Sequence, residues 1–151
     1  MSWRTRLLPW SLAAATVGLA GCMGGDHGDA ERVYQAMTAR DDAHHDAATS
    51  ADDAMRLRAE TDGYAADIAG LLDDMRSACS DMMGSGMMGG TDDDRFEAMT
   101  DQMGTAVDDH HARLTSMTDV DDMRHECDSH HAAMGGMLDE MQDMMVDGGM
   151  M

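Results

Sequence analysis

Nitrogen and sulfur donors recur along this chain at spacings that could bring them together. The 151 residues include eight histidines, three cysteines and 20 methionines. The doublets His44-His45 and His110-His111 are 66 residues apart, and Cys127 closely precedes a third doublet, His130-His131. Imidazole suits zinc and copper, whereas thiolate and thioether sulfur are soft ligands that suit Cu(I). The chemistry that these residues indicate is the binding of a transition metal ion.

A long stretch of the chain repeats at the same offset. Residues 31–79 align with residues 97–145 without a gap and share 16 of 49 positions. A biased composition raises the number of chance matches, but it does not readily place two histidine doublets in register. Two copies of one supersecondary unit is the economical interpretation. The shared positions include Asp42/Asp108, His44/His110, His45/His111, Thr49/Thr115, Asp53/Asp119, Arg58/Arg124, Glu60/Glu126 and Asp62/Asp128.

Apolar residues recur at alternating spacings of four and three, which is typical of helices with one buried face. The Gly-rich run 84–90 separates the two units. Hydroxyl residues at 49–50 and 115–118 lie between the helices of each unit, where we expect them to cap the next helix. The stripe of the last helix comprises Met123, Cys127, His130, Met134, Met137, Met141 and Met144. The predicted helices span residues 29–48, 52–82, 93–115 and 119–146.

Two helical hairpins in tandem predict an all-α protein, an up-down-up-down four-helix bundle over residues 29–147. The turns near Ser50 and Thr118 should lie at one end of this bundle, and the Gly-rich linker at the other. A single long hairpin that forms a homodimer is the nearest alternative, because it would use the same stripes. Cys79 and Cys127 should lie too far apart along the helix axis to form a disulfide.

The duplicated hairpins place four donors on inward stripes near the turns. His44 and His110 lie shortly before their turns, and Cys127 and His130 lie shortly after the second one. We therefore expect these four residues to be the inner ligands of a metal site, with Glu60 and Glu126 orienting the imidazoles. The alternative is that the histidines are only half-buried and hydrogen-bonded to carboxylates. Four further histidines are expected close by, namely His45, His111, His125 and His131.

Methionine pairs supply a second set of soft donors far from the turns. In the interior of the predicted bundle, packing explains methionine, since this residue fills irregular gaps and replaces leucine. Packing does not explain methionine on a glycine-rich loop, although protection against oxidants would. The run 82–88 resembles the methionine-rich segments of bacterial periplasmic copper-handling proteins, which implies Cu(I) capture. The predicted secondary metal site comprises Met82, Met83, Met87, Met88, Met144 and Met145.

The first 21 residues read as a targeting segment. Two arginines precede a short apolar run over residues 7–19, and the motif Leu19-Ala20-Gly21-Cys22 follows. This leader resembles a bacterial lipoprotein signal peptide with its lipobox, which implies cleavage before Cys22 and lipidation of that residue. The chain would then divide into a signal peptide (1–21), a lipidated linker (22–28), the bundle (29–147) and a Met-rich tail (148–151). A cleaved secretory signal with an ordinary cysteine is the alternative.

Charge and missing motifs narrow the function further. The formal net charge of −20 disfavours nucleic acid as a partner, because its phosphates would be repelled. No Cys-x-x-Cys-His sequence for covalent haem and no phosphate-binding loop is present, and the Glu-x-x-His pairs of di-iron bundles are missing. We therefore predict a protein that is not an enzyme.

The sequence as a whole predicts a lipid-anchored, extracytoplasmic protein of the periplasm or cell envelope that binds or buffers copper, with zinc as the second choice. Its architecture resembles that of bacterial copper storage proteins, but those line their interior with many cysteines and this chain does not. Two alternatives stay open. One is a structural or partner-binding lipoprotein without metal, and the other is a b-type haem bundle, which the sequence favours least.

Overall fold

The computed structural model describes residues 27–83 and 90–147, which form four helices and no strand. The bounds agree with those predicted from apolar spacing to within three residues, and the prediction of an all-α four-helix bundle is confirmed. The helices are α1 (His27–Ser50), α2 (Ala54–Met83), α3 (Gly90–Ser116) and α4 (Val120–Asp147).

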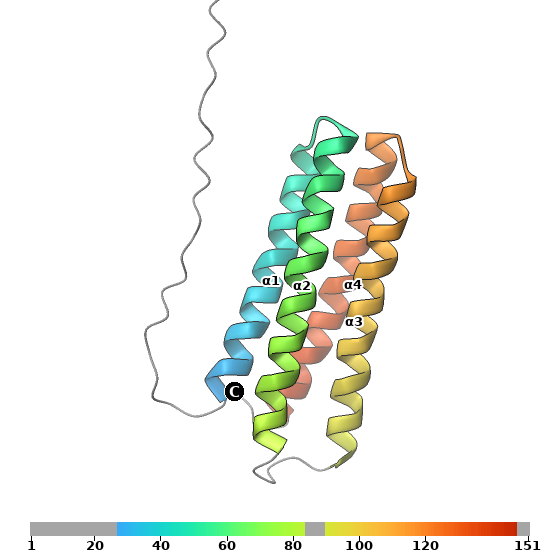
Figure 1. The fold of residues 1–151 in the computed structure, drawn as a ribbon. Helices are drawn as coiled ribbons and strands as arrows, with labels where there is room; N and C mark the ends of the chain where they lie inside the picture. Colours follow the sequence, from blue (N-terminus) through green and yellow to red (C-terminus); the bar gives the residue numbers. More distant parts are fainter. Residues whose placement is uncertain (1–26, 84–89, 148–151) are drawn as a thin grey trace, which may run out of the picture.

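The helices pack in chain order as an antiparallel bundle. Each contacts its neighbours in sequence, and α1 closes the ring against α4. Figure 1 shows that the α1–α2 and α3–α4 loops lie at the same end, which we call the turn pole. Short loops explain this arrangement, because they force consecutive helices to lie side by side in opposite directions.

Aspartates, and not the hydroxyl residues, cap the two helices that begin at the turn pole. Asp53 Oδ1 accepts a hydrogen bond from the backbone N–H of Arg56, and Asp119 Oδ1 accepts from the N–H groups of residues 121 and 122. Thr49 and Ser50 instead donate to carbonyls three residues earlier in α1. The expectation that hydroxyls cap these helices is therefore wrong: a carboxylate accepts these N–H groups and also favours the positive helix end.

Two apolar clusters fill the interior, and a band of buried polar side chains lies between them. The larger cluster occupies the half of the bundle away from the turn pole and is rich in methionine, including Met37, Met75, Met103, Met134 and Met141. The smaller one, here called the pole cluster, consists of Ala48, Ala51, Leu57, Leu114, Met123 and Cys127. The polar band contains Asp41, His44, Thr61, His110 and His130, each 3% exposed or less.

Two arginines tie the hairpins together at the turn pole. Arg58 of α2 donates to the backbone oxygen of Met117, in the α3–α4 loop. Arg124 of α4 donates to the backbone oxygen of Ala51, in the α1–α2 loop. Donors and acceptors are both related by the 66-residue offset. The two ties satisfy a loop carbonyl on each side and hold each loop against the other hairpin.

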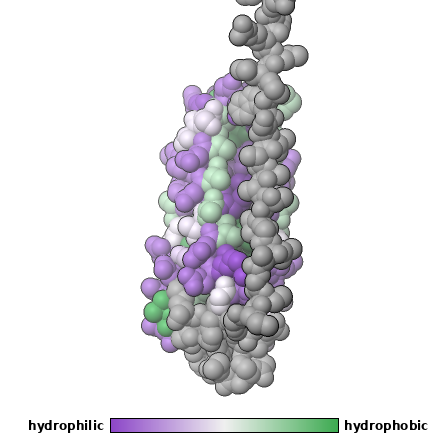
Figure 2. Space-filling view, turned by 90° about the vertical axis from the view of Figure 1, so that its left-hand side faces the viewer, coloured by the Kyte–Doolittle hydropathy of each residue, from purple (hydrophilic) through white to green (hydrophobic). Residues whose placement is uncertain are grey.

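The outer surface is strongly polar. Figure 2 views the side on which α1 lies and shows mainly hydrophilic residues, with a narrow hydrophobic strip along the length of the bundle. Among the described residues, no helix has the length and apolar character that crossing a membrane requires.

Candidate metal centre

Four matched positions form one layer across the bundle. His44 and His110 each lie six residues before the end of their helix, and Thr61 and Cys127 each lie seven residues after the start of theirs. At a rise of 1.5 Å per residue, all four Cα atoms lie roughly 10 Å from the turn pole. All four side chains are buried. We call this set the histidine layer.

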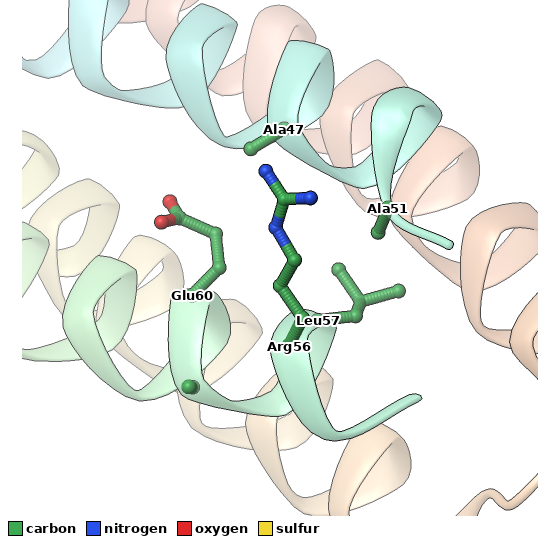
Figure 3. Close-up of a pocket in the computed structure, with 6 residues that line it drawn as sticks. Ala47, Ala51, Arg56, Leu57 and Glu60 are labelled. Carbon is green, nitrogen blue, oxygen red and sulfur yellow. The ribbon is translucent and has the colours of Figure 1, made fainter. Parts of the chain in front are cut away.

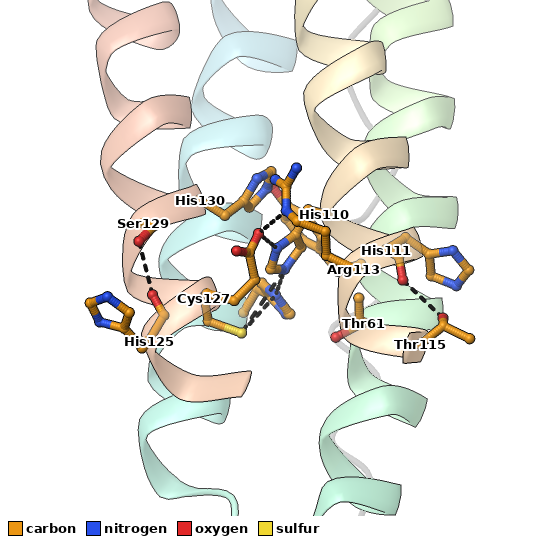
Figure 4. A network of polar contacts seen from close by, with 12 residues as sticks. Thr61, His110, His111, Arg113, Thr115, His125, Cys127, Ser129 and His130 are labelled. Atoms are coloured by element: carbon orange, nitrogen blue, oxygen red, sulfur yellow. Dashed lines mark hydrogen bonds and ion pairs between the residues drawn. The ribbon is translucent and has the colours of Figure 1, made fainter. Parts of the chain in front are cut away.

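Three residues of this layer converge. The Nε2 atoms of His44 and His110 are 3.2 Å apart, and Cys127 Sγ lies 4.0 Å from each of them. One ligand atom from each residue lies within 4.8 Å of the others, and all three residues are buried. Figure 4 shows Cys127 reaching from α4 toward the imidazoles. These three residues could hold a transition metal ion.

Each of the two imidazoles turns its other nitrogen toward a glutamate. His110 Nδ1 lies 3.3 Å from Glu126 Oε1, which also accepts a 2.6 Å hydrogen bond from Arg113 Nε. His44 Nδ1 lies 3.7 Å from Glu60 Oε1, which accepts from Arg40 at 2.8 Å. The expectation that Glu60 and Glu126 flank the imidazoles agrees with this geometry. Carboxylates in this position fix the tautomer and orientation of histidine ligands.

His130, which the sequence groups with the inner ligands, lies beside the converging group and has a different partner. Its ring stacks on that of His110 at a centroid distance of 4.0 Å. Its Nε2 lies 3.0 Å from the hydroxyl of Tyr64, which donates to Asp41 Oδ1 at 2.8 Å. Asp41 also contacts His131 Nδ1 at 2.6 Å. His130 is thus held by a buried hydrogen-bonded chain that leads to the half-exposed His131.

Burial keeps the imidazoles neutral. Desolvation lowers the pKa of His44 to about 3, and the neighbouring His110 adds to this effect. It lowers the pKa of His130 to about 3 as well. The pKa of His110 is lowered by burial, against the opposing influence of Glu126. Neutral imidazoles retain the lone pairs that bind a metal ion.

The thiol of Cys127 is protonated in the absence of a metal ion. Burial raises its pKa to about 12, and the adjacent carboxylates of Glu126 and Asp128 act in the same direction. A thiol of this kind is a poor nucleophile, because the thiolate is the reactive form. A bound cation would remove its proton, since metals bind the thiolate.

The remaining histidines lie toward the surface. His45 Nε2 lies 3.0 Å from Asp128 Oδ1, and His111 Nε2 lies 2.7 Å from Asp62 Oδ1, so both pair with a carboxylate of the other hairpin. His125 is exposed and points away from the centre in Figure 4. None of the three belongs to the converging group of described residues.

The predicted methionine site falls mostly outside the described side chains. Cys22, the leader and the side chains of Met82, Met83, Met87 and Met88 lie outside the described part of the chain. Met145 belongs to the larger apolar cluster, and Met144 packs against it, half-buried. For this last pair, packing against the core explains methionine without a metal.

Tyr64 and Asp41 are site residues that the sequence reasoning missed. The repeat offered a signal for Tyr64, because this residue occupies the position that matches His130. The same relation appears in the stacking, since Tyr64 lies on His44 at 4.2 Å as His130 lies on His110. Asp41 is matched by Val107, so no comparison of the repeats could have identified it.

A pocket of about 310 Å³ opens next to the centre, between α1 and α2. Figure 3 shows Arg56 and Glu60 at its wall together with Ala47, Ala51 and Leu57. Glu60 therefore faces solvent on one side and His44 on the other. None of the three converging residues lines this pocket; among its lining residues, Glu60 lies 3.7 Å from His44 Nδ1.

Comparisons of the chain with models of protein families, with curated proteins and with solved structures find no significant match.

Proposed function

We propose that this protein binds a single transition metal ion at His44, His110 and Cys127, copper first and zinc second, and that it carries or buffers the ion without catalysis. The ion would lie between the two Nε2 atoms and the sulfur of Cys127. One feature of the metal-free protein supports this proposal. The ring nitrogens of His44 and His110 cannot all be given hydrogen-bond partners at the same time.

A neutral imidazole carries one N–H group. Glu126 favours the proton of His110 on Nδ1, which leaves a lone pair on Nε2. If His44 then donates from Nε2 across the 3.2 Å contact, its Nδ1 holds an unprotonated lone pair beside Glu60. That Nδ1 is buried and has no hydrogen-bond partner among the described residues.

A cation between the Nε2 atoms removes this conflict. Both histidines could then carry the proton on Nδ1, toward Glu126 and Glu60, and both Nε2 lone pairs would bind the ion. Leaving a buried polar atom unpaired costs about 1–3 kcal/mol, so the conflict is a measurable instability that metal binding relieves.

The donor set favours copper over zinc. Structural zinc sites are almost always four-coordinate, whereas the group found among the described residues offers three donors of the His and Cys types. Two imidazoles and one thiolate in a threefold arrangement suit copper. The acidic surface would raise the local concentration of cations without selecting among them.

A lipid anchor at Cys22 is part of the proposal. The leader and the Leu19-Ala20-Gly21-Cys22 motif support lipidation at Cys22 and an extracytoplasmic, membrane-anchored location. Mass spectrometry of the protein isolated from cells tests this directly. We expect a diacylglycerol-bearing amino terminus at Cys22, and a Cys22→Ala variant should lose its membrane association. An unmodified Cys22 would contradict the lipid anchor but not the metal site.

The matched offset of the contacts supports a duplicated origin for the two hairpins. The His45–Asp128 and His111–Asp62 pairs correspond, as do the two arginine ties. Duplication would explain why equivalent histidines from α1 and α3 meet on the bundle axis.

Metal titration with thermal unfolding tests the main proposal. A metal that binds only the native state raises the melting temperature. We expect Cu(I) to raise it most and Zn(II) less, and we expect His110→Ala and Cys127→Ala to abolish the shift. His125→Ala is the matched control, because this exposed histidine should leave the shift unchanged.

No shift with any of Cu(I), Cu(II) and Zn(II) would overturn the metal proposal and leave the structural alternative. That alternative is favoured by one observation, the pairing of the outer histidines with carboxylates. A haem bound between His44 and His110 would require the two residues to separate, because a macrocycle does not fit between nitrogen atoms 3.2 Å apart. A haem held by one methionine and one histidine is tested by a Soret band on adding haem.

A further inference from the structure

The two hairpins differ in sulfur at the positions that surround the centre. In the histidine layer, α2 carries Thr61 where α4 carries Cys127. One helical turn closer to the turn pole, α2 carries Leu57 where α4 carries Met123. Both sulfur-containing residues of this matched set thus lie on α4, four residues apart, on the same face of one helix.

Met123 and Cys127 share one apolar cluster. Met123 is 0% exposed and belongs to the pole cluster together with Cys127. Side chains on a helix lean toward its amino terminus, so the thiol of Cys127 lies on the Met123 side of its own Cα. Met123 leans the same way, toward the turn pole, so its three rotatable bonds would have to turn the sulfur back toward the imidazoles.

The residues in the layer of Met123 differ in size between the two hairpins. In the layer of Met123, α1 contributes Ala48 where α3 contributes Leu114. A small residue thus faces the interior on the side from which His44 approaches. The small side chain of Ala48 and the flexible thioether of Met123 are the features that would let the sulfur turn toward the imidazoles.

We propose that Met123 provides the fourth donor of the centre, through its thioether sulfur, and makes it a Cu(I) site with two nitrogen and two sulfur ligands. This inference rests on the proposed function, because it assumes that His44, His110 and Cys127 hold an ion. It goes further by assigning the oxidation state and the residue that selects it.

The charges balance in this arrangement. Cu(I) forms a bond to the sulfur of Cys127, and the S–H proton leaves to solvent. The thioether and both imidazoles are neutral, so the centre carries one positive and one negative charge. A net charge of zero suits a buried position, since isolated charges are costly to bury. Zn(II) would leave one positive charge uncompensated, and a thioether is a poor ligand for it.

The test is the Met123→Leu variant of the full chain. It introduces at position 123 the leucine that α2 carries at the matching position 57. Cu(I) affinity would be measured anaerobically by competition with a chromophoric chelator, and Zn(II) affinity in parallel. We expect Cu(I) affinity to fall by at least on the order of tenfold, as expected from the loss that changing an outer partner alone produces. Zn(II) affinity should change little. X-ray absorption of the Cu(I) form should show two sulfur ligands in the wild type and one in the variant.

Two further methionines provide matched controls. Met117→Leu alters a half-buried thioether that packs against the same pole cluster, and Met141→Leu alters a fully buried one in the larger cluster. Both should retain the Cu(I) affinity and sulfur count of the wild type. Melting temperatures of the metal-free variants would show that each is folded.

The outcomes separate the two proposals. If Met123→Leu keeps its Cu(I) affinity and the wild type shows a single sulfur ligand, the fourth donor is refuted while the metal centre stands. If Met117→Leu loses affinity instead, the assignment to Met123 is wrong. A wild type that binds no metal ion refutes both.

Discussion

The two hairpins have nearly the same framework and carry different chemistry. Both contribute one histidine, His44 or His110, to the shared axis, and both turn a glutamate toward it. Beyond that they diverge, because α4 adds Cys127 and His130 where α2 has Thr61 and Tyr64. The two copies keep the same contacts between hairpins, namely the two arginine ties and the two His–Asp pairs, whereas the donor set depends on residues that only one copy carries.

The largest effect should come from the burial of neutral imidazoles, namely His44, which has a counterpart in the other hairpin, and His130, which only α4 carries. The pKa of His44 is lowered from 6.5 to about 3, as is that of His130. Below pH 6.5 the unfolded chain binds protons that the folded chain does not, so the free energy of unfolding falls as the pH drops toward 3. The slope should exceed about 1 kcal/mol per pH unit for each histidine.

Urea unfolding of the metal-free protein between pH 7 and pH 4 measures this slope. Replacing His44 by Leu should flatten it, and His125→Ala should leave it unchanged. A stability that does not vary over this range would show that the two imidazoles are not buried in neutral form.

The next effect comes from making α4 resemble α2. Cys127→Thr removes the only thiolate of the centre and should lower Cu(I) affinity by more than about a hundredfold, since a direct ligand should count for at least as much as its outer partners. Competition with a chelator measures the loss. Cys79→Ala, which alters the buried cysteine of the larger cluster, should bind as the wild type does. Equal losses in the two variants would point to general destabilisation.

The reverse change makes α2 resemble α4. Thr61 is 1% exposed and lies in the histidine layer opposite Cys127. Thr61→Cys should provide a fourth strong donor and raise Zn(II) affinity by on the order of tenfold or more, because two imidazoles and two thiolates form a tetrahedral zinc site. Cobalt substitution would report the geometry through its visible spectrum. An unchanged zinc affinity would mean that position 61 does not face the ion.

A further effect distinguishes the two glutamates. Glu126 lies closer to its histidine than Glu60 does, at 3.3 Å against 3.7 Å. Glu126→Gln should therefore lower metal affinity by about 10- to 100-fold, and Glu60→Gln by less. The same competition assay measures both. The reverse order would indicate that His44, and not His110, is the better oriented ligand.

The last comparison concerns the hydrogen-bonded chain of Asp41, Tyr64 and His130, which joins the two hairpins at positions where their residues differ. Tyr64→Phe removes the hydroxyl between Asp41 and His130 and leaves two buried groups with one partner fewer. The free energy of unfolding should fall by about 1–3 kcal/mol, with little change in metal affinity. Tyr34→Phe is a control, since its hydroxyl contacts Gln142 at the exposed surface. A large loss of metal affinity would place Tyr64 in the metal site itself.

The sequence predicted the architecture because apolar spacing defines which face of a helix is buried. It also predicted that His44, His110 and Cys127 meet, because the repeat and the two turns set their levels along the axis. It did not distinguish His130 from these ligands, since helical spacing does not say which way a ring turns. Nor did it identify Asp41 or the aspartate caps, because an aspartate in so acidic a sequence gives no distinct signal.

The ligands of the centre come from both hairpins, and this has a mechanical consequence. Cys127 lies 83 residues after His44 in the chain, and both contact His110 within 4.0 Å. An ion held there would act as a cross-link that closes a long loop and resists separation of the halves, much as a disulfide does. Binding and release of the metal ion would therefore be coupled to the association of the two hairpins. A force or a partner that separates the hairpins at the turn pole would also release the ion.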